Sequence, residues 1–172
     1  GEVSVWNASS KTPLIRSTLT FEATCLAFAS EGRLVAGDKH GALYWLSAKT
    51  LRVEKMRRSA HKSTILGIAA SRSGRLVASG ARDRMLRVWD EISGESIVVG
   101  GLKHLGDVRH VAFNPLRKEL AAAGEEGAVR IWDPTTKKPK HVLPTRSAEV
   151  HGIAYSSDGK RLFIADAHAV SI

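Results

Sequence analysis

Three side chains near the middle of the sequence, His61, Ser79 and Asp83, are of the types that perform nucleophilic catalysis. In a catalytic triad the histidine accepts the proton of the serine hydroxyl, and the carboxylate holds the imidazole ring in the required tautomer. Such a serine often lies in a G-x-S-x-G nucleophile elbow next to an oxyanion hole. Residues 76–81 do not match this elbow, and no oxyanion-hole motif is visible. We therefore predict a structural role for the three side chains.

No other group of residues has the spacing of a catalytic, metal or phosphate site. Neither a G-x-x-x-x-G-K-[ST] nor a G-x-G-x-x-G phosphate loop is present. Cys25, beside Leu26 and Phe28, is typical of a small core residue. We predict no catalytic residue, no cofactor and no metal, so that the protein is not an enzyme. The histidines without metal-ligand spacing such as H-E-x-x-H are His40, His110, His141, His151 and His168.

The composition is that of a globular domain. The chain has 172 residues, of which 43% are hydrophobic, and 26 Lys and Arg against 17 Asp and Glu give a formal net charge of +9. This length allows one domain, and a disordered chain would be poorer in large apolar residues. The single cysteine excludes an internal disulfide and a multi-cysteine zinc site, which favours a reducing compartment. We expect an intracellular protein, cytoplasmic or nuclear, and not a secreted one.

The sequence shows neither a membrane segment nor a targeting segment. No apolar run approaches the length of a transmembrane helix, and residues 1–7 lack the basic and apolar pattern of a signal peptide. We therefore expect no membrane span. Because the first residue is Gly and not Met, we also expect the chain to be an interior piece of a longer one.

A pattern that repeats along the whole chain predicts the elements that position these side chains. Four short segments end in a tryptophan, namely Trp6, Trp45, Trp89 and Trp132. The intervals between them are 39, 44 and 43 residues. A period of this length is typical of a propeller blade.

Within each period the sequence predicts four short strands. An apolar run that ends in a turn signal comes first, at 25–32, 66–74, 111–115 and 153–159. A strand of small residues follows, at 34–37, 76–80, 120–124 and 162–165. The tryptophan segment is the third strand, and a fourth follows a polar turn, at 51–56, 96–99 and 140–143. No helical periodicity is long enough for an alternating βα fold, so each period is one four-stranded antiparallel blade.

Two of the periods carry residues that resemble a known family. The segments Arg87-Val-Trp-Asp90 and Arg130-Ile-Trp-Asp133 each contain a tryptophan 28 residues after a histidine, in Ala60-His61 and Lys103-His104. This combination is similar to the WD-repeat β-propellers, and the resemblance covers essentially the whole chain. It implies an all-β propeller of four-stranded antiparallel blades. The family usually closes a ring of about seven blades, and we expect this chain to be a fragment of a seven-bladed ring.

The repeat also predicts the domain organisation, with strands named a, b, c and d from the inside outward. We expect a single β-propeller segment over 1–172: strands c and d at 3–19, blades at about 20–56, 60–99 and 103–143, and strands a, b and c at 150–172. An open ring exposes an unpaired strand edge. Three ways of closing it are open: further blades in unobserved sequence, a second copy that brings the ring to about eight blades, or pairing of 13–19 with the last blade.

The resemblance assigns His61, Ser79, Asp83 and Trp89 to one hydrogen-bonded chain inside a blade. A buried indole N–H needs an acceptor, and a serine hydroxyl can accept it while donating to a histidine that a carboxylate holds. This chain of bonds would lock the turn between strands b and c. The resemblance therefore agrees with the structural role predicted for these residues.

The period that ends in Trp132 matches the family pattern only in part. It keeps a histidine, His104, at the position of His61. Glu126 stands where the family has an aspartate, and Ala122 stands where it has a serine or threonine. We expect at most a partial network in this blade.

The Trp45 period and the last period depart further from the pattern. In the Trp45 period Leu19 stands in the place of the histidine, and His40 lies in what we predict to be a shortened turn between strands b and c. In the last period Arg146 takes the place of the histidine. Packing between blades is then expected to supply most of the stability.

One face of the predicted propeller is a candidate for partner binding. It is formed by the d–a and b–c turns, and its acidic and basic residues balance. The family usually docks peptides and partner domains on this face, so the resemblance implies that other proteins bind there. The candidate contacts are Lys39, Lys62, Ser63, Arg82, Arg84, Asp107, Glu125 and Glu149.

The opposite face, formed by the a–b and c–d turns, has an excess of Lys and Arg. Such a face attracts polyanions such as RNA or an acidic protein surface, although basic turns also keep a β-rich surface soluble. No aromatic residue lies among these basic residues, so the face implies phosphate contact without base stacking. The candidate residues are Arg72, Arg75, Arg117, Lys118, Lys137, Lys138, Lys160 and Arg161.

Three functions follow from these features. The first is a non-enzymatic protein–protein interaction scaffold in a larger assembly. The second is a nucleic-acid-associated propeller, for instance in a ribonucleoprotein, that uses the basic face. The third is a sensor or regulatory propeller of a larger signalling ATPase, whose chemistry would lie outside these residues.

Overall fold

The protein is all-β in a computed structural model, as the sequence predicts. The structure describes residues 1–29, 32–96, 102–103, 106–167 and 170–171. These residues form five antiparallel sheets, which we number in chain order as blades 1 to 5. Blade 1 has two strands, blades 2 to 4 have four each, and blade 5 has three.

The strands follow the chain without a crossover. Blade 1 contains β1 (Glu2–Asn7) and β2 (Thr12–Thr18). Blade 2 contains β3 (Ala23–Phe28), β4 (Arg33–Asp38), β5 (Leu43–Ser47) and β6 (Val53–Arg57). Blade 3 contains β7 (Ile65–Ala70), β8 (Leu76–Ala81), β9 (Met85–Asp90) and β10 (Leu102–Lys103). Blade 4 contains β11 (Val108–Phe113), β12 (Leu120–Gly124), β13 (Ala128–Trp132) and β14 (Pro139–Pro144). Blade 5 contains β15 (Val150–Tyr155), β16 (Leu162–Asp166) and β17 (Val170–Ser171).

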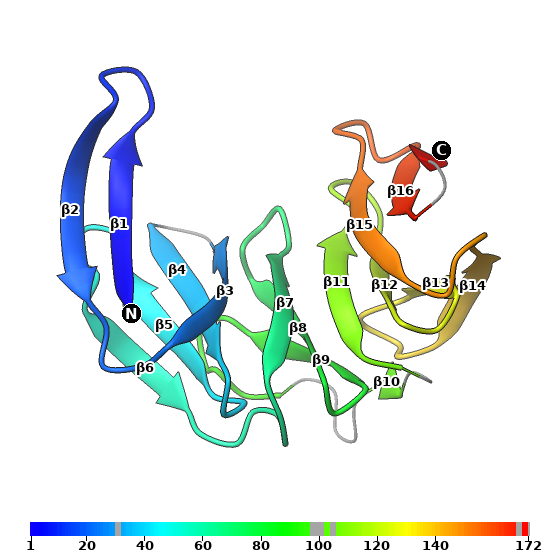
Figure 1. Cartoon of the computed structure of the whole chain (residues 1–172), viewed down its shortest axis with the longest axis horizontal. Coiled ribbons are helices and arrows are strands. Elements are labelled where there is room, and N and C mark those ends of the chain that lie inside the picture. Colours follow the sequence, from blue (N-terminus) through cyan, green and yellow to red (C-terminus); the bar gives the residue numbers. More distant parts are fainter. Residues whose placement is uncertain (30–31, 97–101, 104–105, 168–169, 172) are drawn as a thin grey trace.

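The five blades follow one another along an open arc, with β1–β2 and β15–β17 at its two ends (Figure 1). The first strands of blades 2 to 5, namely β3, β7, β11 and β15, are in contact with one another in series along the inside of this arc. Blade 1 consists of strands c and d only, and blade 5 of strands a, b and c. The described residues therefore form part of a propeller ring.

The turn between strands c and d is built in the same way in four blades. Its first residue accepts backbone N–H groups two or three positions later, and this residue is Asn7, Ser47, Asp90 or Asp133. Four positions after it the backbone is left-handed, with φ between 54° and 69°, at Lys11, Leu51, Gly94 and Lys137. The aspartate that follows the tryptophan in blades 3 and 4 thus acts as the cap of a turn.

The hydrophobic core lies between neighbouring sheets. Ala78 and Val88 of blade 3, for example, belong to one buried cluster with Leu120 of blade 4. Small residues let the sheets approach closely, since a Cβ at Gly67 in β7 would lie 2.4 Å from the backbone oxygen of Arg109 in β11. The alanine- and glycine-rich inner strands are therefore what allows one blade to stack on the next.

Trp45 does not occupy the repeat position predicted for it. In blades 3 and 4 the tryptophan of strand c lies 12 residues after its partner in strand b, and in blade 2 the residue at this separation is Leu46, opposite Leu34. Trp45 is one position earlier and so lies on the other face of its sheet. There it packs in one cluster with Trp89 of blade 3.

A left-handed glycine marks the true register of blade 2. Gly41 has a φ of 82° and stands five residues before Leu46, as Gly127, with a φ of 68°, stands five residues before Trp132. The b–c turn of blade 2 is therefore as long as those of blades 3 and 4, and the shortened turn predicted there is wrong. The interval from Leu46 to Trp89 is 43 residues, equal to the interval from Trp89 to Trp132.

Some predicted features fall on residues that the structure does not describe. In the fourth strand expected at 96–99, Ser96 forms a bridge to Trp89, and 97–99 lie outside the described residues. His104 also lies outside them. In the described part of the chain, no helix has the length and apolar content needed to cross a membrane.

The left-handed positions of the c–d turns provide a test of this turn geometry. A non-glycine residue in this conformation costs about 1–2 kcal/mol, and a glycine loses about 0.5–1 kcal/mol through backbone entropy. We therefore expect Lys137→Gly to raise the free energy of unfolding by about 0.5–1 kcal/mol in a denaturant titration, since blade 3 already has Gly94 at this position. The control is Lys138→Gly, at an exposed neighbour without a positive φ. An equal gain in both variants would contradict the argument.

Candidate functional site

The four residues assigned to one network in blade 3 are brought together by the structure. The indole Nε1 of Trp89 donates to Ser79 Oγ over 2.8 Å, and Ser79 Oγ lies 2.7 Å from His61 Nε2. His61 Nδ1 lies 3.0 Å from Asp83 Oδ1. A carboxylate only accepts, so Nδ1 carries the proton and Nε2 accepts the serine hydroxyl. The chain of donors therefore runs from Trp89 through Ser79 and His61 to Asp83.

This network ties the loop before β7 to the turn after β8. Besides His61, Asp83 accepts the amide of Lys62 at 2.9 Å and the amide of Met85 at 3.1 Å. Burial of the Asp83 carboxyl opposes its ionisation, but these hydrogen bonds outweigh burial and lower its pKa. The ionised carboxylate thus fixes the position of the b–c turn.

The arrangement of Ser79 excludes the role of a nucleophile. Its side chain is fully buried between β7 and β9, and its hydroxyl oxygen already accepts the indole N–H of Trp89. A substrate carbonyl would need open space beside this oxygen. Cys25 is equally unsuited, because burial raises the pKa of its thiol to about 11 and keeps it protonated at neutral pH.

Blade 2 fixes the same turn with different chemistry, which the sequence analysis missed. The ring of Phe21, from the loop before β3, stacks on the ring of Tyr44 with centroids 3.6 Å apart. The Tyr44 hydroxyl donates to Asp38 Oδ2 over 2.9 Å, and Asp38 Oδ1 accepts the amides of His40 and Ala42. A loop-to-turn clasp therefore replaces the network. The positions equivalent to His61, Ser79, Asp83 and Trp89 hold Leu19, Ala36, His40 and Leu46.

Blade 4 has a third arrangement. Glu126, at the position of Asp83, has a buried carboxylate and forms a 2.9 Å ion pair with Arg130 across the b–c turn. Ala122 replaces the serine, and Trp132 packs in the cluster between blades 3 and 4. Because His104 lies outside the described residues, the partial network expected here stays a prediction.

The eight candidate partner contacts lie on one end of the sheets. Lys39, Arg82, Arg84 and Glu125 are in b–c turns, and Lys62, Ser63, Asp107 and Glu149 are in the connections between blades. We call these eight residues the partner face. Ion pairs connect its turns. Arg82 of blade 3 lies 3.9 Å from Asp107 in the connection to blade 4, and Arg109 contacts Glu125 of its own blade and Glu149 in the connection to blade 5.

Charge is not uniform along the partner face. Lys62 and Arg84 are exposed, and neither side chain forms an ion pair with any described residue. Lys39, by contrast, lies 2.6 Å from Glu22. Toward blade 5 the face becomes acidic, because a single arginine, Arg109, forms ion pairs with two glutamates, Glu125 and Glu149. The face thus has a basic part over blade 3 and an acidic part over blades 4 and 5.

The eight candidate polyanion contacts lie at the other end of the sheets, in a–b and c–d turns of blades 3, 4 and 5. We call them the basic face. All eight are exposed. Arg75 lies 3.6 Å from Asp90, whereas the other seven form no ion pair with the described residues.

The same fold and repeat occur in known proteins. The family model described as "WD domain, G-beta repeat" matches residues 53–90 and 98–133. The B-type cell cycle switch protein ccs52A of Medicago truncatula is 28% identical over 166 residues, which are 94% of this chain and 34% of that protein. The serine-threonine kinase receptor-associated protein of Gallus gallus is 29% identical over 65% of this chain and 32% of its own length.

Solved structures share the backbone of the chain. A chain in the crystal structure of the mitotic checkpoint complex has a TM-score of 0.83 at 22% identity. The alignment covers 95% of this chain and 51% of that chain. The computationally designed Ika4 protein has a TM-score of 0.74 at 20% identity, over 90% of this chain and 91% of its own. By comparison, the chain spans about a third of the length of the Medicago truncatula and Gallus gallus proteins.

The two buried tryptophans provide a test of the network in blade 3. Trp89 and Trp45 are each 1% exposed, but Trp45 Nε1 has no hydrogen-bond partner among the described residues. Either Trp→Ala change leaves a cavity, which costs about 3–5 kcal/mol. We expect Trp89→Ala to cost about 1–3 kcal/mol more than Trp45→Ala, because it also leaves the buried hydroxyl oxygen of Ser79 without its donor. Chemical unfolding of the two variants measures the difference, and equal losses would contradict the assignment.

The ionised state of Asp83 provides a pH test. Its pKa is lower in the folded state than the ordinary value of 3.8, so its contribution to stability is complete above that value and is lost as the pH falls through the lower folded value. Asp83→Asn should reduce stability at pH 7, and its deficit against wild type should shrink as the pH falls below about 4. Urea unfolding at several pH values measures this, with Asp107→Asn as the control outside the network. A deficit that does not change with pH would contradict it.

Proposed function

The chain belongs to the WD-repeat β-propeller family, and we propose that it is a non-enzymatic scaffold that binds other proteins within a larger assembly. The feature that supports this most directly is the way the turns of the partner face are fixed. In blade 3 the bond between His61 and Asp83 holds such a turn, and in blade 2 the contacts among Phe21, Tyr44 and Asp38 do so. Turns held in one conformation lose little entropy when a partner binds.

The charges of the partner face suggest what kind of surface it would accept. Lys62 and Arg84 offer free cations over blade 3, and Glu125 and Glu149 share one arginine over blades 4 and 5. A partner with acidic groups opposite the first pair and basic groups opposite the second would be oriented by this pattern. Such complementarity sets the orientation of binding more than its strength.

The known proteins that resemble this chain agree with a scaffold. One is named as a kinase receptor-associated protein, one as a cell cycle switch protein, and one belongs to a solved complex. By analogy we place this chain among the components of an intracellular assembly, in the cytoplasm or the nucleus. No catalytic role is proposed for it.

A second candidate function, in a ribonucleoprotein, is supported by the basic face. Seven of its eight exposed residues form no ion pair with the described residues, so their charge is available to phosphates. Contacts with phosphates release counterions, and binding of this kind weakens steeply as salt rises. The same residues would also accept an acidic protein surface.

Purification of variants of each face tests the choice between the two functions. We expect the tagged protein to retain stoichiometric protein partners after nuclease treatment, as measured by mass spectrometry. The double variant Lys62→Glu/Arg84→Glu should lose them, because it reverses two exposed charges of the partner face. The matched control Arg117→Glu/Lys118→Glu, which reverses two exposed charges of the basic face, should keep them.

The opposite pattern would support the second candidate. If the companions disappear with nuclease, the scaffold proposal is wrong. If nuclease-resistant partners are lost only from the Arg117→Glu/Lys118→Glu variant, they bind the basic face and the assignment to the partner face is wrong. Unfolding curves equal to that of the wild type would show that both variants are folded.

A further inference from the structure

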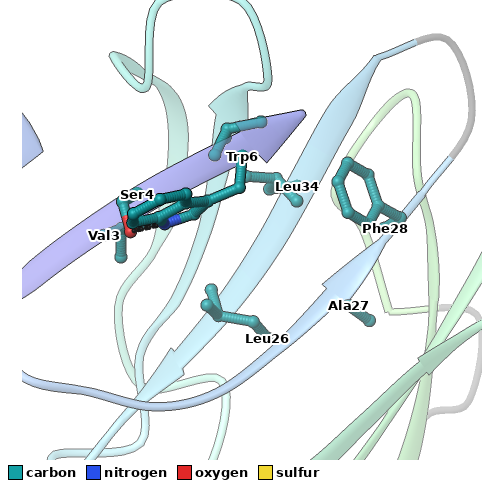
Figure 2. Close-up of a pocket in the computed structure, with 8 residues that line it drawn as sticks. Val3, Ser4, Trp6, Leu26, Ala27, Phe28 and Leu34 are labelled. Atoms are coloured by element: carbon teal, nitrogen blue, oxygen red, sulfur yellow. Dashed lines mark hydrogen bonds between the residues drawn. The ribbon is translucent and has the colours of Figure 1, made fainter. Parts of the chain in front are cut away.

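The hollow between β1 and β3 is largely apolar. It has a volume of about 350 Å³, and its walls include Leu26 and Phe28 (Figure 2). No charged side chain is among the described residues that line it, and the Ser4 hydroxyl there already accepts the indole N–H of Trp6 over 2.9 Å. The a–b turn of blade 3, between β7 and β8, is by contrast polar, because it places a serine between two arginines.

This a–b turn combines an exposed hydroxyl with exposed cations. Ser73 is exposed, and so are Arg72 and Arg75 on either side of it. Arg72 forms no ion pair with any described residue, and Arg75 lies 3.6 Å from Asp90. The hydroxyl oxygen of Ser73 lies 3.2 Å from that of Ser71. The turn therefore presents a nucleophilic oxygen in a basic surrounding.

The a–b turn of blade 5 has the same bonds but carries an anion. Ser156 Oγ donates to Asp158 Oδ1 over 2.6 Å, and the same oxygen accepts the amide of Lys160 at 3.0 Å. These bonds, with the nearby charge of Arg161, hold the pKa of Asp158 below its ordinary value of 3.8. The turn thus stabilises a negative charge at the position of Asp158.

Ser73 occupies the position of Asp158 in its own turn. A left-handed glycine follows each residue, namely Gly74 with a φ of 69° and Gly159 with a φ of 64°. Ser73 Oγ accepts the amide of Arg75 over 3.5 Å, which is the longer counterpart of the bond that Asp158 accepts. An anion attached to Ser73 would therefore meet donors that the turn already provides, with two arginines beside it.

We propose that Ser73 is a phosphorylation site for a protein kinase that selects basic residues around its acceptor. The Ser73 hydroxyl oxygen forms a bond to the γ-phosphorus of ATP, and the bond from that phosphorus to the β,γ-bridging oxygen breaks. ADP leaves, and the hydroxyl proton passes to a base of the kinase. The phosphate carries about −1.5 to −2 charges at pH 7 and accepts hydrogen bonds from the guanidinium groups of Arg72 and Arg75.

Phosphorylation of Ser73 changes the charge of the basic face over blade 3. Arg72 and Arg75 contribute two positive charges to this turn, and the phosphate nearly cancels them. Arg75 also exchanges its contact with Asp90 for one with the phosphate. The attraction of polyanions to this part of the basic face then falls. This consequence rests on the second candidate function, whereas the modification site itself does not.

Labelling of the protein tests the site directly. The probe is ATP with a recombinant kinase that phosphorylates serines flanked by arginines, and the position of the phosphate is read by peptide mass spectrometry. We expect phosphate on Ser73, and Ser73→Ala should lose most of the label. The matched control Ser93→Ala should keep it, because Ser93 is an exposed serine of the same blade beside Asp90 and Glu95. Absence of phosphate from Ser73 with an active kinase, or equal labelling of Ser93, would overturn the proposal.

Two charge substitutions test whether the turn accepts an anion, without a kinase. Ser73→Asp gives blade 3 the side chain that blade 5 has, so the variant should keep or raise the midpoint of urea unfolding. Ser93→Asp should lower the midpoint, because the Ser93 hydroxyl donates to Asp90 Oδ1 over 3.2 Å and a carboxylate there is repelled. The difference between the two variants should shrink as salt rises. Equal losses in both variants would show that the turn does not stabilise an anion and would contradict the assignment.

Discussion

The stacking of each inner strand on the strand of the neighbouring blade is the contact on which the rest of this structure depends. It requires very small residues on one side, as at Gly67, whose position tolerates no side chain beside the backbone of β11. It also requires larger apolar residues on the other side, as at Val111 and Phe113, which pack against the core between blades 3 and 4. Because this contact is repeated from blade to blade, the turns at both ends of the sheets are set in rows. The partner face and the basic face exist only because of these rows.

Two chemically unrelated sets of contacts hold the b–c turn in blades 2 and 3. In blade 3 the loop that enters the blade reaches the b–c turn through His61 and Asp83, and in blade 2 it does so through Phe21 and Tyr44. In blade 3 the imidazole needs a buried serine as its donor, and that serine needs an indole as its own donor, whereas blade 2 needs only ring contact and a tyrosine hydroxyl that donates to a carboxylate. Loss of the family's hydrogen-bonded residues from a blade therefore does not release its turn.

The period of the chain, the antiparallel blades and the residues of the blade 3 network could be predicted from the sequence, because each depends on residue types at fixed separations. The register of blade 2 could not, since Trp45 and Leu46 are adjacent and a shift by one residue exchanges the two faces of a strand. The signal that resolves it, a glycine five positions before the core residue, is visible only when the left-handed turn is known. The contact between Phe21 and Tyr44 joins residues with no shared motif, and folding alone brings them together.

The c–d turns show that one backbone conformation is compatible with several residue types. An amide, a hydroxyl and two carboxylates cap the same turn at Asn7, Ser47, Asp90 and Asp133, and the position four residues later holds lysine, leucine or glycine. Any short side chain with an oxygen atom can accept the backbone N–H groups of this turn. The sequence of these turns can therefore change while the backbone stays the same, and two chains with one fold can share few identical residues. A protein with 22% identity and a TM-score of 0.83 illustrates this freedom.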